Sequence, residues 1–181
     1  MKATETKLEG CFVLEPTIFE DKRGYFFESF NQEKFNTLIN KNVAFVQDNE
    51  SFSSKGVLRG LHYQVGAHAQ AKLVRVIKGK VLDVAVDVRA NSKTFGQHVA
   101  VELSEDNKKQ LFVPRGFAHG FIVLSDTAIF SYKCDNLYNK ESEGGIIYND
   151  PKLNIDWQLP ENELLVSQKD VVLPNLDNAR L

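Results

Sequence analysis

Two short segments contain the residue types and spacings best suited to chemistry. Residues 56–64 read Gly-Val-Leu-Arg-Gly-Leu-His-Tyr-Gln and contain Arg59 and His62, while residues 114–121 read Pro-Arg-Gly-Phe-Ala-His-Gly-Phe and contain His119. An imidazole titrates near neutral pH, so it can serve as an acid, a base or a metal ligand. Both segments are otherwise rich in apolar residues, where an unpaired buried polar group is costly. These polar side chains are therefore candidates for a functional site.

The spacing of the two segments resembles the two signature motifs of cupin barrels, Gly-x5-His-x-His and Pro-x-Gly-x2-His. Gln64 stands at the position of the second histidine of the first motif, so only His62 and His119 remain from the ligand set. A transition metal is usually held by three or four nitrogen, oxygen or sulfur ligands. The sequence thus predicts a cupin-type barrel whose cavity works without a metal.

Other polar residues interrupt strand-like apolar runs in the same way. Alone, each is more often structural than functional, but together they indicate a cavity within one small barrel. Strict alternation would place Arg59 and His62 on opposite faces of a strand. A bulge at Gly60 would turn both side chains inward. The full set is Arg59, His62, Lys72, Asp83, His119 and Tyr132.

A histidine, a lysine and a tyrosine without a metal suggest proton abstraction next to a carbonyl group. The histidine would be the base, Lys72 would stabilise the enolate, and Tyr132 would return a proton. A base and an acid on opposite faces of a carbon invert its configuration. The structural alternatives are that Lys72 extends to solvent at a strand edge and that Tyr132 packs in the core.

Strand patterns dominate the chain. Residues 31–40 form the one convincing helix, which Asn31 can cap and Asn40 can end. Many short strands separated by turn residues are typical of a sandwich or barrel. We therefore predict an all-β, cupin-type jelly-roll barrel with one or two short helices and an irregular C-terminal extension from Asn139. The predicted strands are residues 12–19, 24–30, 43–48, 57–64, 71–77, 81–88, 98–103, 110–113, 117–124 and 128–134.

Length and composition fit one domain over residues 1–181. The net charge of −2 gives no indication of a nucleic-acid surface, and no apolar run is long enough to cross a membrane. The two cysteines, Cys11 and Cys134, show no metal or redox spacing. Free thiols predict a cytoplasmic protein.

The chain resembles the dTDP-4-dehydrorhamnose 3,5-epimerase family, the metal-free cupins of dTDP-L-rhamnose synthesis, almost from end to end. The resemblance implies epimerisation of dTDP-4-dehydro-6-deoxy-D-glucose at C3 and C5, with no cofactor and no metal. An enolate forms next to the C4 ketone and is reprotonated from the opposite face. The segments that carry the resemblance are residues 21–29, 45–49, 56–64, 69–75, 114–121, 142–144 and 169–170.

The resemblance also implies a role for each catalytic candidate. His62 is expected to remove the protons, and Tyr132 to act as the acid on the opposite face. Lys72 is expected at the C4 oxygen of the sugar. Asp170 is expected to orient His62, and Asp83 is a second candidate for that role.

A larger set is expected to bind a dTDP-4-keto-6-deoxyhexose. Members of the family are homodimers in which the N-terminal region of one subunit completes the neighbouring site. Arg23, Phe26 and Glu28 would then act across the interface. No nucleic acid or membrane partner is expected. The expected substrate contacts are Arg23, Phe26, Glu28, Gln47, Asn49, Arg59, His119, Glu143 and Lys169.

Three alternatives stay open at this point. A metal cupin, such as a dioxygenase, requires ligands beyond His62 and His119. A sugar-nucleotide binding module without catalysis predicts loss of the base or the acid, yet both His62 and Tyr132 are present. A mono-epimerase acting at C3 or C5 alone would carry the same residues and differ in pocket shape.

Overall fold

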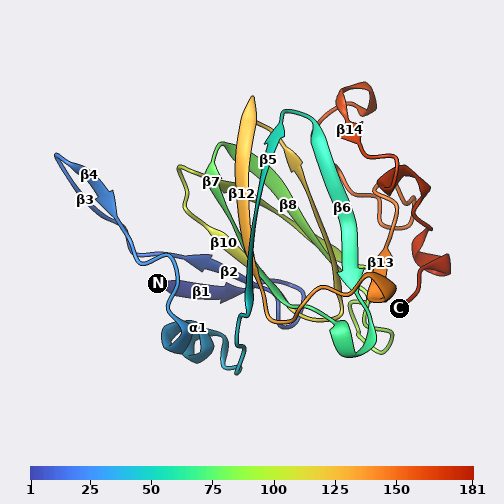
Figure 1. Ribbon diagram of the computed structural model, residues 1–181, viewed down its shortest axis with the longest axis horizontal. Coiled ribbons are helices and arrows are strands. Elements are labelled where there is room, and N and C mark those ends of the chain that lie inside the picture. The colour runs from blue at the N-terminus through green and yellow to red at the C-terminus, as the bar shows by residue number, and fades with distance from the viewer.

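The computed structural model describes residues 1–181 as two facing six-stranded sheets (Figure 1). The first sheet has the order β1 (Lys2–Glu5), β2 (Phe12–Glu15), β10 (Gln110–Val113), β7 (Lys72–Lys78), β12 (Thr127–Cys134) and β5 (Gln47–Ser54). The second has the order β13 (Glu143–Gly145), β6 (Val57–Gln64), β11 (Phe117–Val123), β8 (Lys80–Asp87) and β9 (His98–Ser104), with β14 (Leu165–Val166) parallel to β6. The predicted all-β jelly-roll barrel is confirmed.

Apolar residues alternate between the two faces of the second sheet. In β11, Phe117 and Phe121 pack in the core between the sheets, whereas Ala118 and Ile122 pack in a second core on the outer face. That outer core also contains Trp157 and is covered by the C-terminal extension, which Figure 1 shows in orange and red beside β6. A strand that is buried on both faces has a nearly continuous apolar sequence instead of an alternating one.

The C-terminal extension contains no long helix or strand. It is held by short 3₁₀ turns at Lys140–Ser142, Glu161–Glu163, Asp170–Val172 and Leu176–Asn178, and another such turn lies at Gly66–His68. No helix of the structure combines the length and the apolar character needed to cross a bilayer. The irregular extension that the sequence predicts is therefore a packed layer on the second sheet.

The predicted helix is confirmed as α1 (Gln32–Ile39). The Asn31 side chain accepts a hydrogen bond from the Lys34 amide at 3.1 Å, and Asn40 adopts the left-handed conformation that ends the helix. Phe35 and Ile39 are buried in a third apolar cluster that includes Leu73 of β7, whereas the next residue of that strand, Val74, packs in the core between the sheets. The helix therefore covers part of the outer face of the first sheet.

Between β2 and α1 the chain leaves the barrel as a hairpin of β3 (Phe19–Asp21) and β4 (Gly24–Phe26). Figure 1 shows this hairpin projecting away from both sheets. All six strand residues are exposed, including Phe19 and Phe26. The predicted strands 12–19 and 24–30 are therefore too long, because the exposed aromatic residues of the hairpin do not pack against the sheets of their own chain.

Two other strand predictions differ from the structure. Residues 43–46 of the predicted strand 43–48 form no strand, and β5 instead runs from Gln47 to Ser54 through a serine-rich segment. Every residue of β5 pairs with β12, so tertiary pairing outweighs the turn preference of serine. The polar strand β1 was missed, since its stability comes from pairing with β2 and not from an apolar pattern.

Candidate active site

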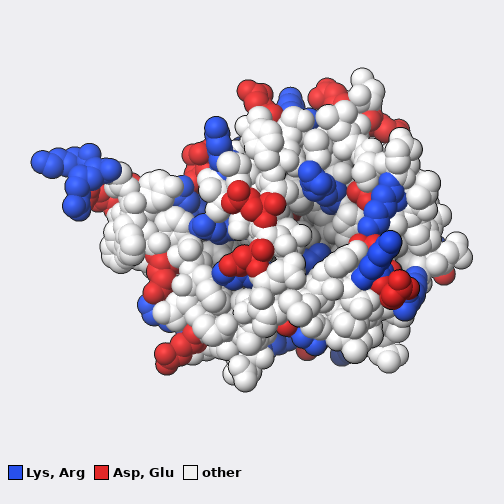
Figure 2. Space-filling model, in the orientation of Figure 1, with Lys and Arg blue, Asp and Glu red and all other residues white.

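Side chains from both sheets surround a cleft at one end of the barrel. Two adjoining cavities, of about 690 and 740 Å³, share His62, Lys72, Tyr132 and Lys169 in their linings. Figure 2 shows the hollow on this face, with basic side chains near it. Each cavity falls in the size range of small-molecule sites.

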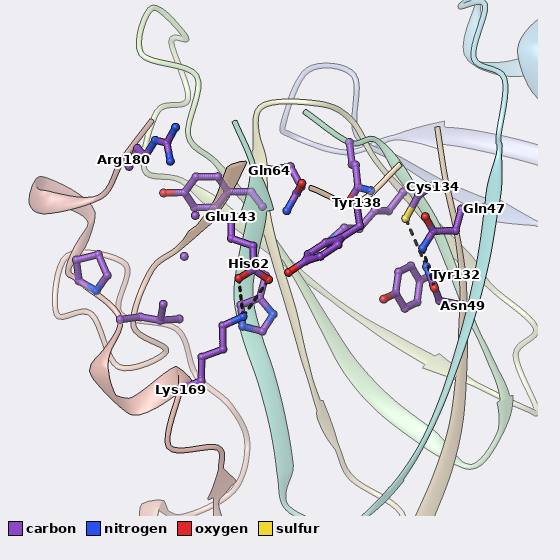
Figure 3. Close-up of a pocket in the computed structure, with 17 residues that line it drawn as sticks. Gln47, Asn49, His62, Gln64, Tyr132, Cys134, Tyr138, Glu143, Lys169 and Arg180 are labelled. Carbon is purple, nitrogen blue, oxygen red and sulfur yellow. Dashed lines mark hydrogen bonds and ion pairs between the residues drawn. The ribbon is translucent and has the colours of Figure 1, made fainter. Parts of the chain in front are cut away.

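The ladder of the first sheet sets one wall of the cleft. Across the strands, Lys72 of β7 lies opposite Cys134 of β12, which lies opposite Gln47 of β5. Two residues along, Tyr132 lies opposite Asn49. Gln47 Nε2 donates to Asn49 Oδ1 at 3.0 Å, and Asn49 Nδ2 donates to Cys134 Sγ at 3.8 Å. The sheet register therefore gathers these polar side chains on one face, as Figure 3 shows.

A bulge in β6 sets the opposite wall, as predicted. Arg59 pairs with Phe121 and His62 with His119, so three steps along β6 match two along β11. Gly60 lies at this shift with φ of 130°, and a Cβ there would approach the Gly120 Cα to 2.5 Å. Both Arg59 and His62 consequently line the larger cavity.

His62 is held by a carboxylate from the C-terminal extension. Its Nε2 lies 2.7 Å from Oδ1 of Asp170, which is buried. Burial alone would raise the pKa of Asp170, but hydrogen bonds from His62 and the Gly60 amide outweigh it and hold the pKa below its usual value. An ionised carboxylate only accepts, so Nε2 carries the hydrogen and Nδ1 is left to take a proton.

Asp83, the other candidate partner of His62, contacts a different histidine. Both of its carboxylate oxygens lie 3.0 Å from Nε2 of His119, and both residues are buried. The structure therefore places Asp170, and not Asp83, against His62. No three His, Cys, Asp or Glu side chains converge in a way that could hold a metal ion.

Lys72 and Tyr132 lie together across the cleft from His62. The Lys72 Nζ is 6.0 Å from the centre of the Tyr132 ring, and Figure 3 shows His62 and Tyr132 on opposite sides of the cavity. Burial lowers the pKa of Lys72, partly opposed by Cys134 and Asp83. Burial also raises the pKa of Tyr132, so the phenol keeps its proton at neutral pH. The arrangement can place a base and an acid on opposite faces of a bound sugar.

An ion pair forms the rim nearest the C-terminal extension. Lys169 Nζ lies 2.9 and 2.8 Å from the two carboxylate oxygens of Glu143. This contact lowers the pKa of Glu143 and raises that of Lys169. A hydrogen bond to Glu143 also raises the pKa of Tyr138. Both charged residues were expected at the site from the sequence.

Several lining residues were not expected from the sequence. Tyr138 and Arg180 lie in the irregular C-terminal segment, where no strand periodicity indicates which side chains face inward. The polar residue Gln64 is buried inside a strand and could have been found by the criterion that selected His62. The unexpected lining side chains include Gln64, Gln70, Tyr138 and Arg180.

Three residues that were expected to contact the substrate lie far from the cleft of their own chain. Arg23, at the tip of the projecting hairpin, pairs with Asp21 at 2.6 Å, and Phe26 is 71% exposed. Glu28 pairs with Lys34 of α1 at 2.9 Å. The expected residues that the structure does gather at the cleft are Gln47, Asn49, Arg59, His62, Lys72, His119, Tyr132, Glu143, Lys169 and Asp170.

Comparison with known proteins identifies one family. The family model described as dTDP-4-dehydrorhamnose 3,5-epimerase matches residues 5–178. The protein of that name from Salmonella typhimurium is 53% identical over 184 residues, which cover 100% of this chain and 98% of the relative. The crystal structure of the protein of that name from Elizabethkingia anophelis NUHP1 is 58% identical with a TM-score of 0.95, over 98% of this chain and 97% of that one.

A third relative is solved with a sugar nucleotide. It is a dTDP-6-deoxy-D-glucose-3,5-epimerase from Legionella pneumophila Philadelphia 1 in complex with dTDP-4-keto-L-rhamnose. It is 49% identical with a TM-score of 0.94, over 98% of this chain and 93% of that one. On the family match, the identities and the shared fold, this chain belongs to the dTDP-4-dehydrorhamnose 3,5-epimerase family.

Proposed function

We propose that this protein is an isomerase that inverts C3 and C5 of dTDP-4-dehydro-6-deoxy-D-glucose, giving dTDP-4-dehydro-L-rhamnose for dTDP-L-rhamnose biosynthesis. One observation carries the proposal: the carboxylate-held His62 faces Tyr132 and Lys72 across a single cleft. Family membership supports the reaction class, and the Legionella relative binds dTDP-4-keto-L-rhamnose.

The first half of the reaction breaks a carbon–hydrogen bond. C3 and C5 both neighbour the C4 ketone, so the electrons of either bond can move onto the C4 oxygen. His62 takes the proton at Nδ1, because Asp170 holds Nε2. The Lys72 ammonium stabilises the charge that develops on the C4 oxygen. General base catalysis of this kind contributes roughly 10²–10⁴-fold.

The second half forms the new bond on the opposite face. Tyr132 donates its phenolic proton to the carbon, the enolate electrons form the new carbon–hydrogen bond, and the carbonyl returns. Solvent then restores the proton of the phenol and removes the proton from His62. The steps balance without any oxidant or reductant, and the same groups serve both carbons when the sugar turns in the site.

We assign the rest of the nucleotide sugar to the polar lining of the cleft. Arg59 donates to Ser53 Oγ at 3.2 Å through Nε and Nη2, so its remaining donors can meet a diphosphate or the sugar. His119 lines the same cavity as Arg59. The other proposed contacts are Gln47, Asn49, Glu143 and Lys169.

The functional unit is proposed to be a homodimer in which the projecting hairpin completes the neighbouring cleft. The hairpin holds Arg23 and Phe26 in the open, with no contact to the cleft of its own chain. At the mouth of the neighbouring cleft, a cation could bind the diphosphate and an aromatic ring could pack against the thymine base of the nucleotide. A monomeric mass by light scattering at working concentration would contradict this arrangement.

A cytoplasmic location is proposed as well. Cys11 and Cys134 are both free and buried. Free thiols are typical of a reducing compartment. Cell fractionation with an antibody to the protein tests this, and recovery outside the cytoplasmic fraction would contradict it.

The function is tested by proton NMR of dTDP-4-keto-6-deoxyglucose incubated with the protein in D₂O. We expect deuterium at both C3 and C5, and conversion to dTDP-L-rhamnose when the downstream reductase is added. Deuterium at one carbon would establish a mono-epimerase instead. No exchange at either carbon would refute the proposed reaction.

A further inference from the structure

Lys72 has no fixed counter-ion in the cleft. Its ammonium takes part in none of the eleven ion pairs of the structure and donates no hydrogen bond to another side chain. Its surroundings disfavour a positive charge, since burial lowers its pKa. A lysine that stabilises an enolate has to keep its proton at the working pH. A nearby negative charge would meet that need.

Three carboxylates line the two cavities, and each of them is engaged elsewhere or exposed. Asp170 binds His62, and Glu143 binds Lys169. Glu50 of β5 is exposed. Asp83 of β8 lines neither cavity, but it is fully buried against His119, its one side-chain partner, and His119 lines the same cavity as Lys72.

The other titratable groups facing Lys72 supply no negative charge at neutral pH. Cys134 lies directly opposite Lys72 in the ladder, but burial raises the pKa of its thiol. Burial likewise raises the pKa of Tyr132. The groups of β6 and β11 that line the same cavity are Arg59, His62 and His119, which are cationic or neutral. Asp83, held against this lining by His119, is the buried carboxylate that can balance the Lys72 ammonium.

We propose that Asp83 is a positioning residue whose buried carboxylate keeps Lys72 protonated, while His119 holds that carboxylate in place. The inference rests on the proposed function only for the role of Lys72 at the enolate. It gives a purpose to an acid that the sequence suggested as a partner of His62 and that the structure places elsewhere.

The geometry of the second sheet supports this assignment. Asp83 of β8 pairs with Phe121 of β11, and His119 pairs with Ala85. Alternation therefore turns Asp83 and His119 toward the barrel interior, beside Phe130, whose ring lies 6.2 Å from that of His119. Charges interact over longer distances in such an interior than in water. The negative charge of Asp83 accordingly opposes the fall in the pKa of Lys72.

The test is a direct titration of Lys72 in the full chain without substrate. Protein labelled with ¹³C at lysine Cε gives one NMR signal for each lysine, and Lys72→Met identifies the signal of Lys72. We expect Asp83→Asn to lower the pKa of Lys72, because the variant removes a negative charge that opposes the effect of burial. Because the readout needs no turnover, it does not depend on the reaction.

Activity gives a second readout. The active form carries a protonated lysine, so kcat falls as pH rises through the pKa of Lys72. Asp83→Asn should move this alkaline fall in kcat to lower pH by the same amount.

Asp87→Asn is the matched control. Asp87 lies on the same strand as Asp83 and is equally buried, but its partner Arg89 lines neither cavity, whereas His119, the partner of Asp83, lines the larger one. The control should leave the Lys72 titration unchanged. If Asp83→Asn does not fold, Asp83→Ser is the second neutral variant, because it is smaller and keeps an acceptor for His119.

Each outcome decides the matter. A lower pKa of Lys72 in the neutral Asp83 variant, with no change in the control, supports the inference. An unchanged Lys72 titration in that variant overturns it, even if the wild-type protein exchanges deuterium at both carbons. An equal shift in both variants also overturns it, because general loosening of β8 would then be the cause.

Discussion

Two histidine–carboxylate pairs lie in the same barrel and differ chiefly in their exposure. In the mouth pair, His62–Asp170, the histidine side chain is 39% exposed. In the floor pair, His119–Asp83, it is 7% exposed, although the contacts are similar at 2.7 and 3.0 Å. A base must give its proton to solvent between turnovers, which suits the mouth pair. The enclosed floor pair suits a fixed electrostatic role.

The two pairs also differ in how the chain assembles them. The mouth pair joins residues 108 positions apart and forms only when the C-terminal extension docks on the second sheet. The floor pair joins residues 36 positions apart on neighbouring strands of one sheet. The floor pair is therefore part of the barrel itself, whereas the mouth pair depends on a separate covering layer.

Replacing the base should have the largest effect on the reaction. His62→Ala is expected to abolish deuterium exchange at C3 and C5, a loss of roughly 10²–10⁴-fold or more. The comparison variant is His119→Ala, which should weaken substrate binding yet retain exchange at saturating substrate. NMR in D₂O measures both. If His119→Ala lost exchange and His62→Ala kept it, the roles of the two pairs would be reversed.

Replacing the acid should separate exchange from inversion. With Tyr132→Phe, His62 can still remove a proton and return it to the same face. We expect deuterium exchange to persist while inversion falls, so the ratio of exchange to inversion rises by about tenfold or more. Time courses of deuterium content and product formation give that ratio. Inversion at the wild-type rate would refute the acid role of Tyr132.

The smallest effect on activity is expected from a buried carboxylate that serves neither pair. Burial alone would raise the pKa of Asp87, but hydrogen bonds from Arg89, Ser92 and Thr94 lower it to about 2 from 3.8. A lowered folded-state pKa stabilises the protein above about pH 3.8, and this contribution disappears as the pH falls toward 2.

Asp87→Asn should therefore lower the free energy of unfolding by about 2 kcal/mol at pH 7, with kcat unchanged. Urea unfolding at pH 7 and at low pH measures the effect, and the difference between variant and wild type should shrink as the pH falls. A fall in kcat at pH 7 would show that charges along β8 are not separable, which would weaken the distinction drawn for Asp83.

Local patterns explain why parts of the fold could be predicted. The Asn31 cap, the Gly60 bulge and the strand Val57–Gln64 each depend on a few neighbouring residues, and each was found where expected. The polar β1 and the serine-rich β5 were missed or misplaced, since their pairing partners lie elsewhere in the chain. The strands of the exposed hairpin were predicted too long, because its exposed aromatic residues pack in no apolar core of this chain.

The fold class and the set of candidate groups could be predicted from the amino-acid sequence alone, because alternation and motif spacing are properties of residues close together in the chain. It left two acids as candidates for one histidine. Only the tertiary structure assigned Asp170 to His62 and Asp83 to His119. That choice depends on how the C-terminal extension packs over the second sheet. Buried apolar contacts hold the extension there and so bring Asp170 to a histidine 108 positions earlier in the chain.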